Sequence, residues 1–226
     1  MEKMKNNTAK RYLFFLIGIL INAFGVALIT KAALGTSPIS SVPYVLSLRF
    51  TPTLGAFTFV MNLIFIILQP VLLRRDYQPI QLLQIVVNIV FSWFIDVSMN
   101  LLGWLEPQNI AVELIVLLLG CAVLGFGISV EVAPDVLLVP GEGLVGALTA
   151  ASGRRFGSVK VAFDVTLVLI SLALSLLFFH RLNGLGLGTV ISALLVGRFV
   201  NLYNSRLPLI AHIARLAHKP DAAKTE

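Results

Sequence analysis

Pro140, Gly141, Glu142 and Gly143 interrupt a long apolar run, and a second apolar segment begins directly after them. Proline is favoured at the first position of a helix, where its missing N–H is not needed, so the segment predicts a short helix over 140–152. The carboxylate would then lie in the first turn, where the helix dipole stabilises negative charge. The two glycines allow a close backbone approach. This pattern indicates a polar site whose carboxylate could bind a ligand or accept a proton.

A similar interruption occurs in the first part of the chain, where Ser37 precedes Pro38 and a second short helix is predicted over 38–49. The first N–H groups of a helix have no partner inside the helix, so its start is a site of partial positive charge. Ser40 and Ser41, together with the serine before the proline, could cap this start or add hydrogen-bond donors. Both predicted helix starts are therefore candidate binding elements.

The two broken segments, 31–52 and 132–153, are too polar to span a membrane and too apolar for ordinary loops. Seven extended residues reach roughly 23 Å, and a helix of twelve residues returns about 18 Å. Each segment is therefore long enough to enter the membrane and come back, as broken helices do in transporters. The alternative is that both short helices lie flat at the two membrane surfaces, with Glu142 facing water.

Ionisable and amide side chains inside the apolar segments form a second group of candidates. A charge in the hydrocarbon region costs a few kcal/mol, so such residues usually face a cavity or a partner. Lys160 and Asp164 are one helical turn apart and can pair, Lys160 could also extend to the membrane surface, and Arg198 is a second candidate partner for Asp164. The predicted substrate-binding set is Ser37, Ser40, Ser41, Asn88, Asp96, Gly141, Glu142, Gly143, Lys160, Asp164 and Arg198.

Buried asparagines have a second interpretation, because amide side chains also join helices inside a membrane. Joining helices is the favoured role for four asparagines of the predicted spans, Asn22, Asn62, Asn88 and Asn100. The glycine-rich stretch 184–198 lacks the lysine and the spacing of a nucleotide-binding loop, and it is more typical of closely packed helices. Cys121 is the only cysteine and lies in an apolar run, so we interpret it as a packing residue.

The sequence contains no Ser-His-Asp arrangement, no HExxH motif and no paired carboxylates of the kind that hydrolases use. Its histidines, His180, His212 and His218, lie at the edges of apolar runs or in the tail. One cysteine cannot provide a metal-binding cluster. We therefore expect neither an enzyme nor a protein with a metal ion or an organic cofactor.

The composition identifies an all-α integral membrane protein. The 226 residues are 58% hydrophobic and only 12% charged, and the mean hydropathy is +0.93, whereas soluble domains carry about 25% charged residues. The main contact is therefore the lipid bilayer. A span needs about 20 apolar residues, and six candidate transmembrane helices are predicted over 11–30, 53–73, 79–103, 109–130, 157–179 and 186–204.

The net charge of +6 comes from basic residues in short flanks around the apolar spans. This distribution is typical of membrane topology and not of a nucleic-acid-binding surface. If the N-terminus is cytoplasmic, most lysines and arginines flank the spans on the inner side, and the outer flanks hold only Lys31, Arg49 and Arg181. This bias predicts that the N- and C-termini are both cytoplasmic. The tail 205–226 is expected to form an interfacial helix followed by a disordered end.

The two halves of the chain correspond when one is displaced by 102 residues along the other, which places Pro38 on Pro140. Because the first half contains three predicted spans, the second half would enter the membrane from the opposite side. The pattern therefore predicts a 3+3 inverted repeat over 1–103 and 104–204, a design common in secondary transporters. The alternative is a chance alignment of apolar chains. The coinciding pairs are Gly18 and Gly120, Phe24 and Phe126, Gly25 and Gly127, Pro38 and Pro140, Leu46 and Leu148, and Gly55 and Gly157.

Several motifs of the second half resemble the YczE/YitT-like bacterial membrane proteins. They are the Pro-Gly-Glu-Gly segment at 140–143, the Gly-x-Val-Lys pattern at 157–160 followed by Asp164, and the Gly-x-Gly-Thr start of the last span at 186–189. Asn88 and Asp96 also occupy positions where that family tends to carry Asn and Asp. The resemblance implies a protein of the bacterial cytoplasmic (inner) membrane, and it implies no particular substrate.

Two functions fit these features. The first is a secondary transporter or exporter of a small polar organic solute, with Glu142 and Asp164 as candidate proton carriers and with Lys160 and Arg198 balancing the charge. The second is a non-transporting membrane scaffold or regulatory partner of another protein, in which these carboxylates would tolerate neutral replacement. Six spans are few for a transport pathway through a single chain, so the sequence leaves room for a homodimer.

Overall fold

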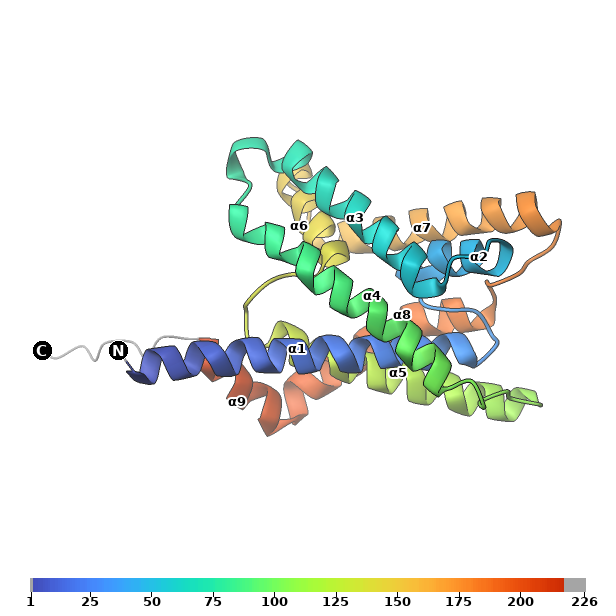
Figure 1. The fold of residues 1–226 in the computed structure, drawn as a ribbon, viewed down its shortest axis with the longest axis horizontal. Helices are drawn as coiled ribbons and strands as arrows, with labels where there is room; N and C mark the ends of the chain where they lie inside the picture. The colour runs from blue at the N-terminus through green and yellow to red at the C-terminus, as the bar shows by residue number, and fades with distance from the viewer. Residues whose placement is uncertain (1, 218–226) are drawn as a thin grey trace, which may run out of the picture.

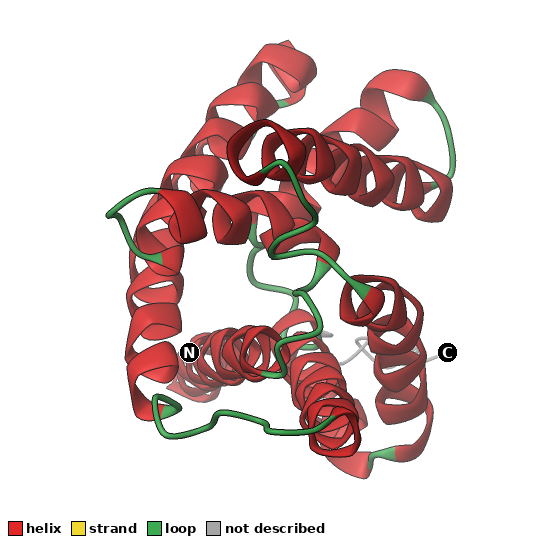
Figure 2. Ribbon diagram, turned by 90° about the vertical axis from the view of Figure 1, so that its right-hand side faces the viewer, coloured by secondary structure: helices red, strands yellow, loops and turns green. Residues whose placement is uncertain are grey.

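A computed structural model describes residues 2–217, which form helices joined by short turns and loops (Figures 1 and 2). The long helices are α1 (Glu2–Lys31), α3 (Leu54–Leu73), α4 (Gln84–Leu101), α5 (Ile110–Val132), α7 (Phe156–Phe179) and α8 (Leu187–Arg206). The shorter helices are α2 (Ser41–Arg49), α6 (Pro140–Ser152) and α9 (Pro208–Ala217). The all-helical fold predicted from the composition is confirmed.

Six segments are long and apolar enough to cross a membrane, which confirms the predicted number of spans. Many of their large apolar side chains are exposed, as they are on α3 at Val60, Ile64, Ile67 and Val71, and such surfaces suit a lipid environment. The six segments are Asn7–Lys31, Leu54–Asp76, Pro79–Leu101, Ile110–Val132, Phe156–Phe179 and Leu187–Arg206.

The two predicted short helices are present and begin at the predicted prolines. The helix α6 starts at Pro140. The helix predicted over 38–49 consists of a 3₁₀ turn, Pro38–Ser40, followed directly by α2. The residues that precede the two prolines have nearly the same backbone conformation, with φ −66° and ψ 152° at Ser37 and φ −64° and ψ 156° at Val139. Proline restricts its preceding residue to this extended region, so sequence alone sets both helix starts.

The chain also bends in the same way before each short helix. Ala33 and Asp135 both have a positive φ, of 62° and 48°, and they are separated by the same 102 residues as the two prolines. A positive φ is uncommon for residues other than glycine. The shared bend therefore adds to the sequence correspondence between the two segments.

The helices α1 and α5 lie side by side over much of their length (Figure 1). Glycines allow this approach, because an added Cβ at Gly25 would lie 2.6 Å from the backbone nitrogen of Leu124, and one at Gly127 would lie 2.5 Å from that of Asn22. Gly18 meets the backbone of Glu131 even more closely. The order of these contacts shows that the two helices run antiparallel.

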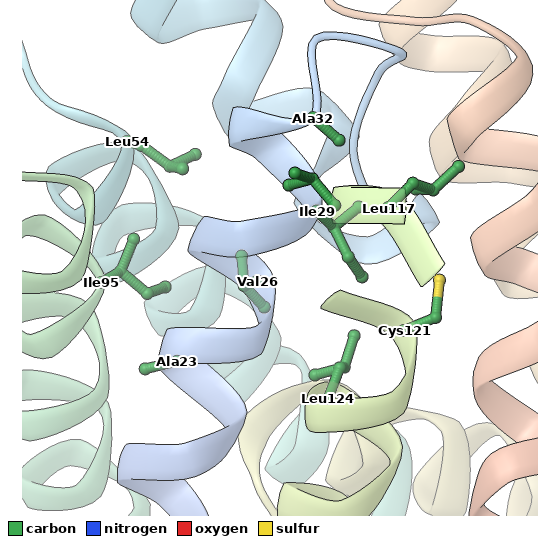
Figure 3. Packing of buried hydrophobic residues seen from close by; sticks show 10 residues of the cluster. Ala23, Val26, Ile29, Ala32, Leu54, Ile95, Leu117, Cys121 and Leu124 are labelled. Carbon is green, nitrogen blue, oxygen red and sulfur yellow. The ribbon is translucent and has the colours of Figure 1, made fainter. Parts of the chain in front are cut away.

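The largest cluster of buried apolar residues lies on this helix pair. Figure 3 shows Val26 and Ile29 of α1 together with Leu117, Cys121 and Leu124 of α5. The cysteine is completely buried, as expected for a packing residue. This apolar core fixes α1 against α5, and the short helices are positioned relative to that pair.

The helix α9 packs against the starting end of α1 through Ile210 and Ile213, which are buried with Val130 of α5. A short helix after the last span is therefore confirmed, and its position at a membrane interface stays a prediction. The predicted disordered end, 218–226, lies outside the described residues.

Candidate functional site

The starts of the two short helices meet inside the fold. A Cβ added at Gly141 would clash with the end of the Ile39 side chain, so the first turn of α6 lies against the 3₁₀ turn before α2. Within residues 2–217, neither Ser37 nor Val139 provides a side-chain cap for the helix that follows it. The N–H groups of the first turns therefore contribute partial positive charge to this place. We call residues 36–41 and 139–143 the helix junction.

The three predicted serines lie at the junction, but they do not act as caps. Ser37, Ser40 and Ser41 are buried. The hydroxyl of Ser37 donates to that of Ser40 at 3.0 Å, and Ser41 donates to the carbonyl of Pro38 at 2.6 Å. The capping prediction was wrong, because these hydroxyls bond within the turn itself.

Glu131, at the end of α5, is a buried carboxyl that the sequence analysis missed. Its exposed fraction is 2%, and its Oε2 accepts a hydrogen bond of 2.8 Å from the Nδ2 of Asn22. Glu142 lies close enough to act on it electrostatically. Glu131 is thus buried in the last turn of α5, and Glu142 is half-buried in the first turn of α6. Carboxyl groups in such surroundings are the groups that carry protons in membrane pumps and transporters.

No basic side chain neutralises Glu131 within the described residues, in which the single ion pair joins Lys160 and Asp164. The nearby cation of Arg11 is engaged elsewhere, because its Nε donates to the carbonyl of Pro134 at 2.8 Å and its Nη2 donates to that of Asp135 at 2.6 Å. These bonds fix the link between α5 and α6. Glu131 therefore has an amide partner and a carboxyl neighbour, and the arginine holds the backbone beside it.

Two buried glutamines hold the start of α6 from the other side. Gln69 of α3 and Gln84, the first residue of α4, exchange two side-chain hydrogen bonds of 2.9 and 3.2 Å, and Gln69 also donates to the carbonyl of Pro140 at 3.4 Å. A Cβ at Gly143 would lie 2.9 Å from the Gln69 amide, which explains the glycine at that position. No local sequence pattern marks this amide pair.

We expect Gln69→Leu to destabilise the protein by about 1–3 kcal/mol, because it leaves the Gln84 amide buried without its partner. The double variant Gln69→Leu/Gln84→Leu should be more stable than the sum of the two single changes predicts, since it removes both polar groups together. Thermal unfolding in detergent measures this difference. Additive losses would show that the two amides do not stabilise each other.

Lys160 and Asp164 pair with each other as one of the sequence alternatives proposed. The Nζ to Oδ1 distance is 2.7 Å, and both side chains are about one quarter exposed, at 27% and 24%. Arg198 is exposed and makes no ion pair with Asp164 within residues 2–217, so that suggested pair was wrong. The reason is geometric, because one turn of α7 already supplies the partner for Asp164.

Asn88 and Asp96 have structural partners. Asn88 is fully buried, accepts from the Nδ2 of Asn62 at 2.9 Å and donates to the carbonyl of Phe59 at 3.0 Å, so it joins α4 to α3. Asp96 accepts from the hydroxyl of Thr53 at 2.6 Å and from the backbone N–H of Gly55 at 2.8 Å. The aspartate therefore holds the start of α3 against α4.

The start of α8 supports the segment before α2. The N–H of Gly188 donates to the carbonyl of Leu34 at 2.8 Å, and a Cβ at Gly186 would lie 2.6 Å from that oxygen. These two glycines therefore permit close packing, as predicted. Gly197 has nothing within 4 Å in the described structure, so the packing expected for the whole glycine-rich stretch applies only to its start.

A cavity of about 550 Å³ lies at the end of the fold that contains Lys31. Tyr44 and Ser47 of α2 face it, and Asp96 is part of its wall. Thr30 also lines it, and the Thr30 hydroxyl bonds to that of Thr36 in the helix junction at 2.8 Å. The cavity thus approaches the junction from one end of the molecule.

Comparisons with known proteins agree with a membrane protein. The model of DUF6198, a family of unknown function, matches residues 9–205. The chain is 26% identical to the uncharacterized membrane protein YczE of Bacillus subtilis over 86% of this chain and 85% of that protein. It is 25% identical to the uncharacterized protein YyaS of the same organism, over 85% and 92%. No solved structure matches.

Proposed function

This chain belongs to DUF6198, a family of unknown function, and we propose from its site that it carries out proton-coupled transport of a small polar organic solute. The observation that carries the proposal is the helix junction, which has Glu142 in the first turn of α6, together with the buried carboxyl of Glu131 at the end of α5. Broken helices that meet in the interior, together with buried carboxyl groups, are the elements with which secondary transporters bind solutes and protons.

An inverted repeat would supply the two conformations that such transport needs, and reciprocal contacts support it. Gly18 packs on Glu131, while Ile29 packs on Gly120. The displacement of 102 residues relates Gly18 to Gly120 and Ile29 to Glu131. The contact of Gly18 with Glu131 is therefore equivalent to the contact of Gly120 with Ile29. Ile39 and Gly141, which touch at the junction, are equivalent by the same displacement. A structure with this symmetry can exchange the conformations of its halves and so expose the junction to either side.

The charged groups of the site fit proton coupling. Glu131 keeps its hydrogen bond from Asn22 whether or not the carboxyl carries a proton, because Oε2 can accept in both forms. Glu142 is at the start of α6, where the helix dipole stabilises its charged form. The negative charge of these two carboxylates can therefore be neutralised at one time by a proton and at another time by a cationic group of the solute.

We further propose that the site lies in the bacterial inner membrane with the termini in the cytoplasm, which accords with the distribution of lysine and arginine.

Alternating access at the junction can be tested with a single cysteine. We would combine Glu142→Cys with Cys121→Ala and treat intact cells and inverted vesicles with a membrane-impermeant thiol reagent. The proposal predicts labelling from both sides, in proportions that change when a solute or a proton gradient is added. Ser158→Cys and Gln108→Cys are the controls, because both positions are exposed. Ser158 is in the first turn of α7 and Gln108 is in the loop before α5, on opposite sides of the predicted topology. Labelling of position 142 from one side under all conditions would contradict the proposal.

A further inference from the structure

The cavity near Lys31 has a lining that carries more negative than positive charge. Its charged side chains are the carboxylates of Asp96 and Glu106 and the ammonium of Lys31. Each oxygen of Asp96 accepts one hydrogen bond within the protein, and a carboxylate oxygen has capacity for a second. The carboxylates that line the cavity can therefore neutralise the charge of a bound cation.

Helix ends reinforce this negative potential. The helices α1, α2 and α4 all contribute residues of their final turns, among them Thr30, Leu48 and Asn100. The C-terminal end of a helix carries partial negative charge and favours a nearby cation. One helix, α3, begins at the cavity, but Asp96 and Thr53 already accept hydrogen bonds from its first N–H groups. The helix dipoles thus add to the charge of the carboxylates.

The remaining lining is suited to the apolar part of a solute. Tyr44, Leu48, Met99 and Leu105 provide aromatic and aliphatic surface, and the hydroxyls and amides provide hydrogen-bonding groups. A volume of about 550 Å³ lies within the range of sites that hold small organic molecules. Tyrosine is also one of the side chains whose ring faces attract cations.

One residue of the cavity wall is bonded to the helix junction. Thr30 is in the cavity wall, and its hydroxyl is hydrogen bonded to that of Thr36, which precedes Ser37 of the junction. Both threonines are almost completely buried. This bonded pair joins the cavity wall to the helix junction.

We propose that the cavity lined by Asp96, Glu106 and Tyr44 binds an organic amine cation with an apolar body. In the proposed transport cycle, on which this inference rests, the amine occupies the cavity before or after the helix junction. The carboxyl groups of Glu131 and Glu142 would continue the same preference for positive charge further inside. The solute of the transporter is then a small cationic amine.

Three compounds of similar size and different charge test this preference: 2-phenylethylamine, phenylalanine and 3-phenylpropionate. Equilibrium dialysis of each labelled compound against the purified full-length protein in detergent measures binding. We expect the amine to bind best and the carboxylate worst. Equal binding of the three, or no binding of the amine, would overturn the inference.

Charge variants identify the cavity as the binding place. Glu106→Gln should weaken amine binding about threefold and Lys31→Gln should strengthen it by a similar factor, as expected for an exposed and a half-buried charge that water still screens. Glu113→Gln is the matched control, since this glutamate is on α5 outside the cavity lining, and it should leave binding unchanged. Equal effects of Glu106→Gln and Glu113→Gln would place the amine elsewhere. Failure here would leave two-sided labelling at position 142 unaffected, so the two proposals can fail separately.

Discussion

Replacing Gly18 with alanine is expected to reduce the stability of the protein strongly. A Cβ at this position clashes with the backbone of Glu131, which cannot rotate away as a flexible side chain would. The helices α1 and α5 would have to separate along their whole contact, and overpacking of this kind typically costs about 1–3 kcal/mol. The apparent unfolding temperature in detergent and the monodisperse fraction after size-exclusion chromatography should both fall.

Gly197→Ala is the matched control for this prediction. It makes the same chemical change inside a long helix, but nothing in the described structure lies within 4 Å of the added carbon. Alanine has a higher helix propensity than glycine by about 1 kcal/mol, so this variant should be as stable as the original protein or slightly more stable. Equal losses at positions 18 and 197 would show that α1 and α5 do not approach each other as described.

Glu131→Gln is expected to abolish proton coupling while the protein stays folded. Glutamine has nearly the same size, and its amide oxygen can still accept from the Nδ2 of Asn22. The change removes only the ability to bind and release a proton. In proteoliposomes that contain a pH indicator, the original protein should move protons when a low-molecular-weight fraction of bacterial cytoplasm is added. The Glu131→Gln protein should give the signal of protein-free liposomes.

Two controls accompany this experiment. Glu113→Gln changes a glutamate at the opposite end of the same helix and should leave the proton signal unchanged. Thermal unfolding should show that Glu131→Gln is as stable as the original protein. A folded Glu131→Gln protein with an unchanged proton signal would contradict a role for this carboxyl in coupling.

The helices and the two short-helix starts could be predicted because their signals are local. Pro38 and Pro140 restrict the residues before them and begin helices, and each span is a continuous apolar run. The pair of Lys160 and Asp164 was predictable for the same reason, since one helical turn brings the two side chains together. Local rules of this kind need no knowledge of how helices pack.

The most informative site contacts depend on packing and could not be predicted. Asn22 and Glu131 are 109 residues apart, and only the close antiparallel approach of α1 and α5 brings them together. Glu131 lies at the end of an apolar run, where a charged residue normally marks the membrane surface, so its burial had no local signal. Gln69 and Gln84 likewise become partners only when α3 packs against the start of α4.

The central claim is that this protein moves a solute, and uptake by proteoliposomes tests it most directly. Proteoliposomes would be incubated with a ¹³C-labelled low-molecular-weight extract of bacterial cells under an imposed pH gradient, and their trapped contents would be identified by mass spectrometry. We expect one or a few polar solutes to accumulate with the original protein and not with Glu131→Gln or in protein-free liposomes. The experiment requires folded protein in both orientations in the two protein-containing preparations, and pH gradients of both directions. Identical contents in all three preparations under these conditions would contradict the proposed transport.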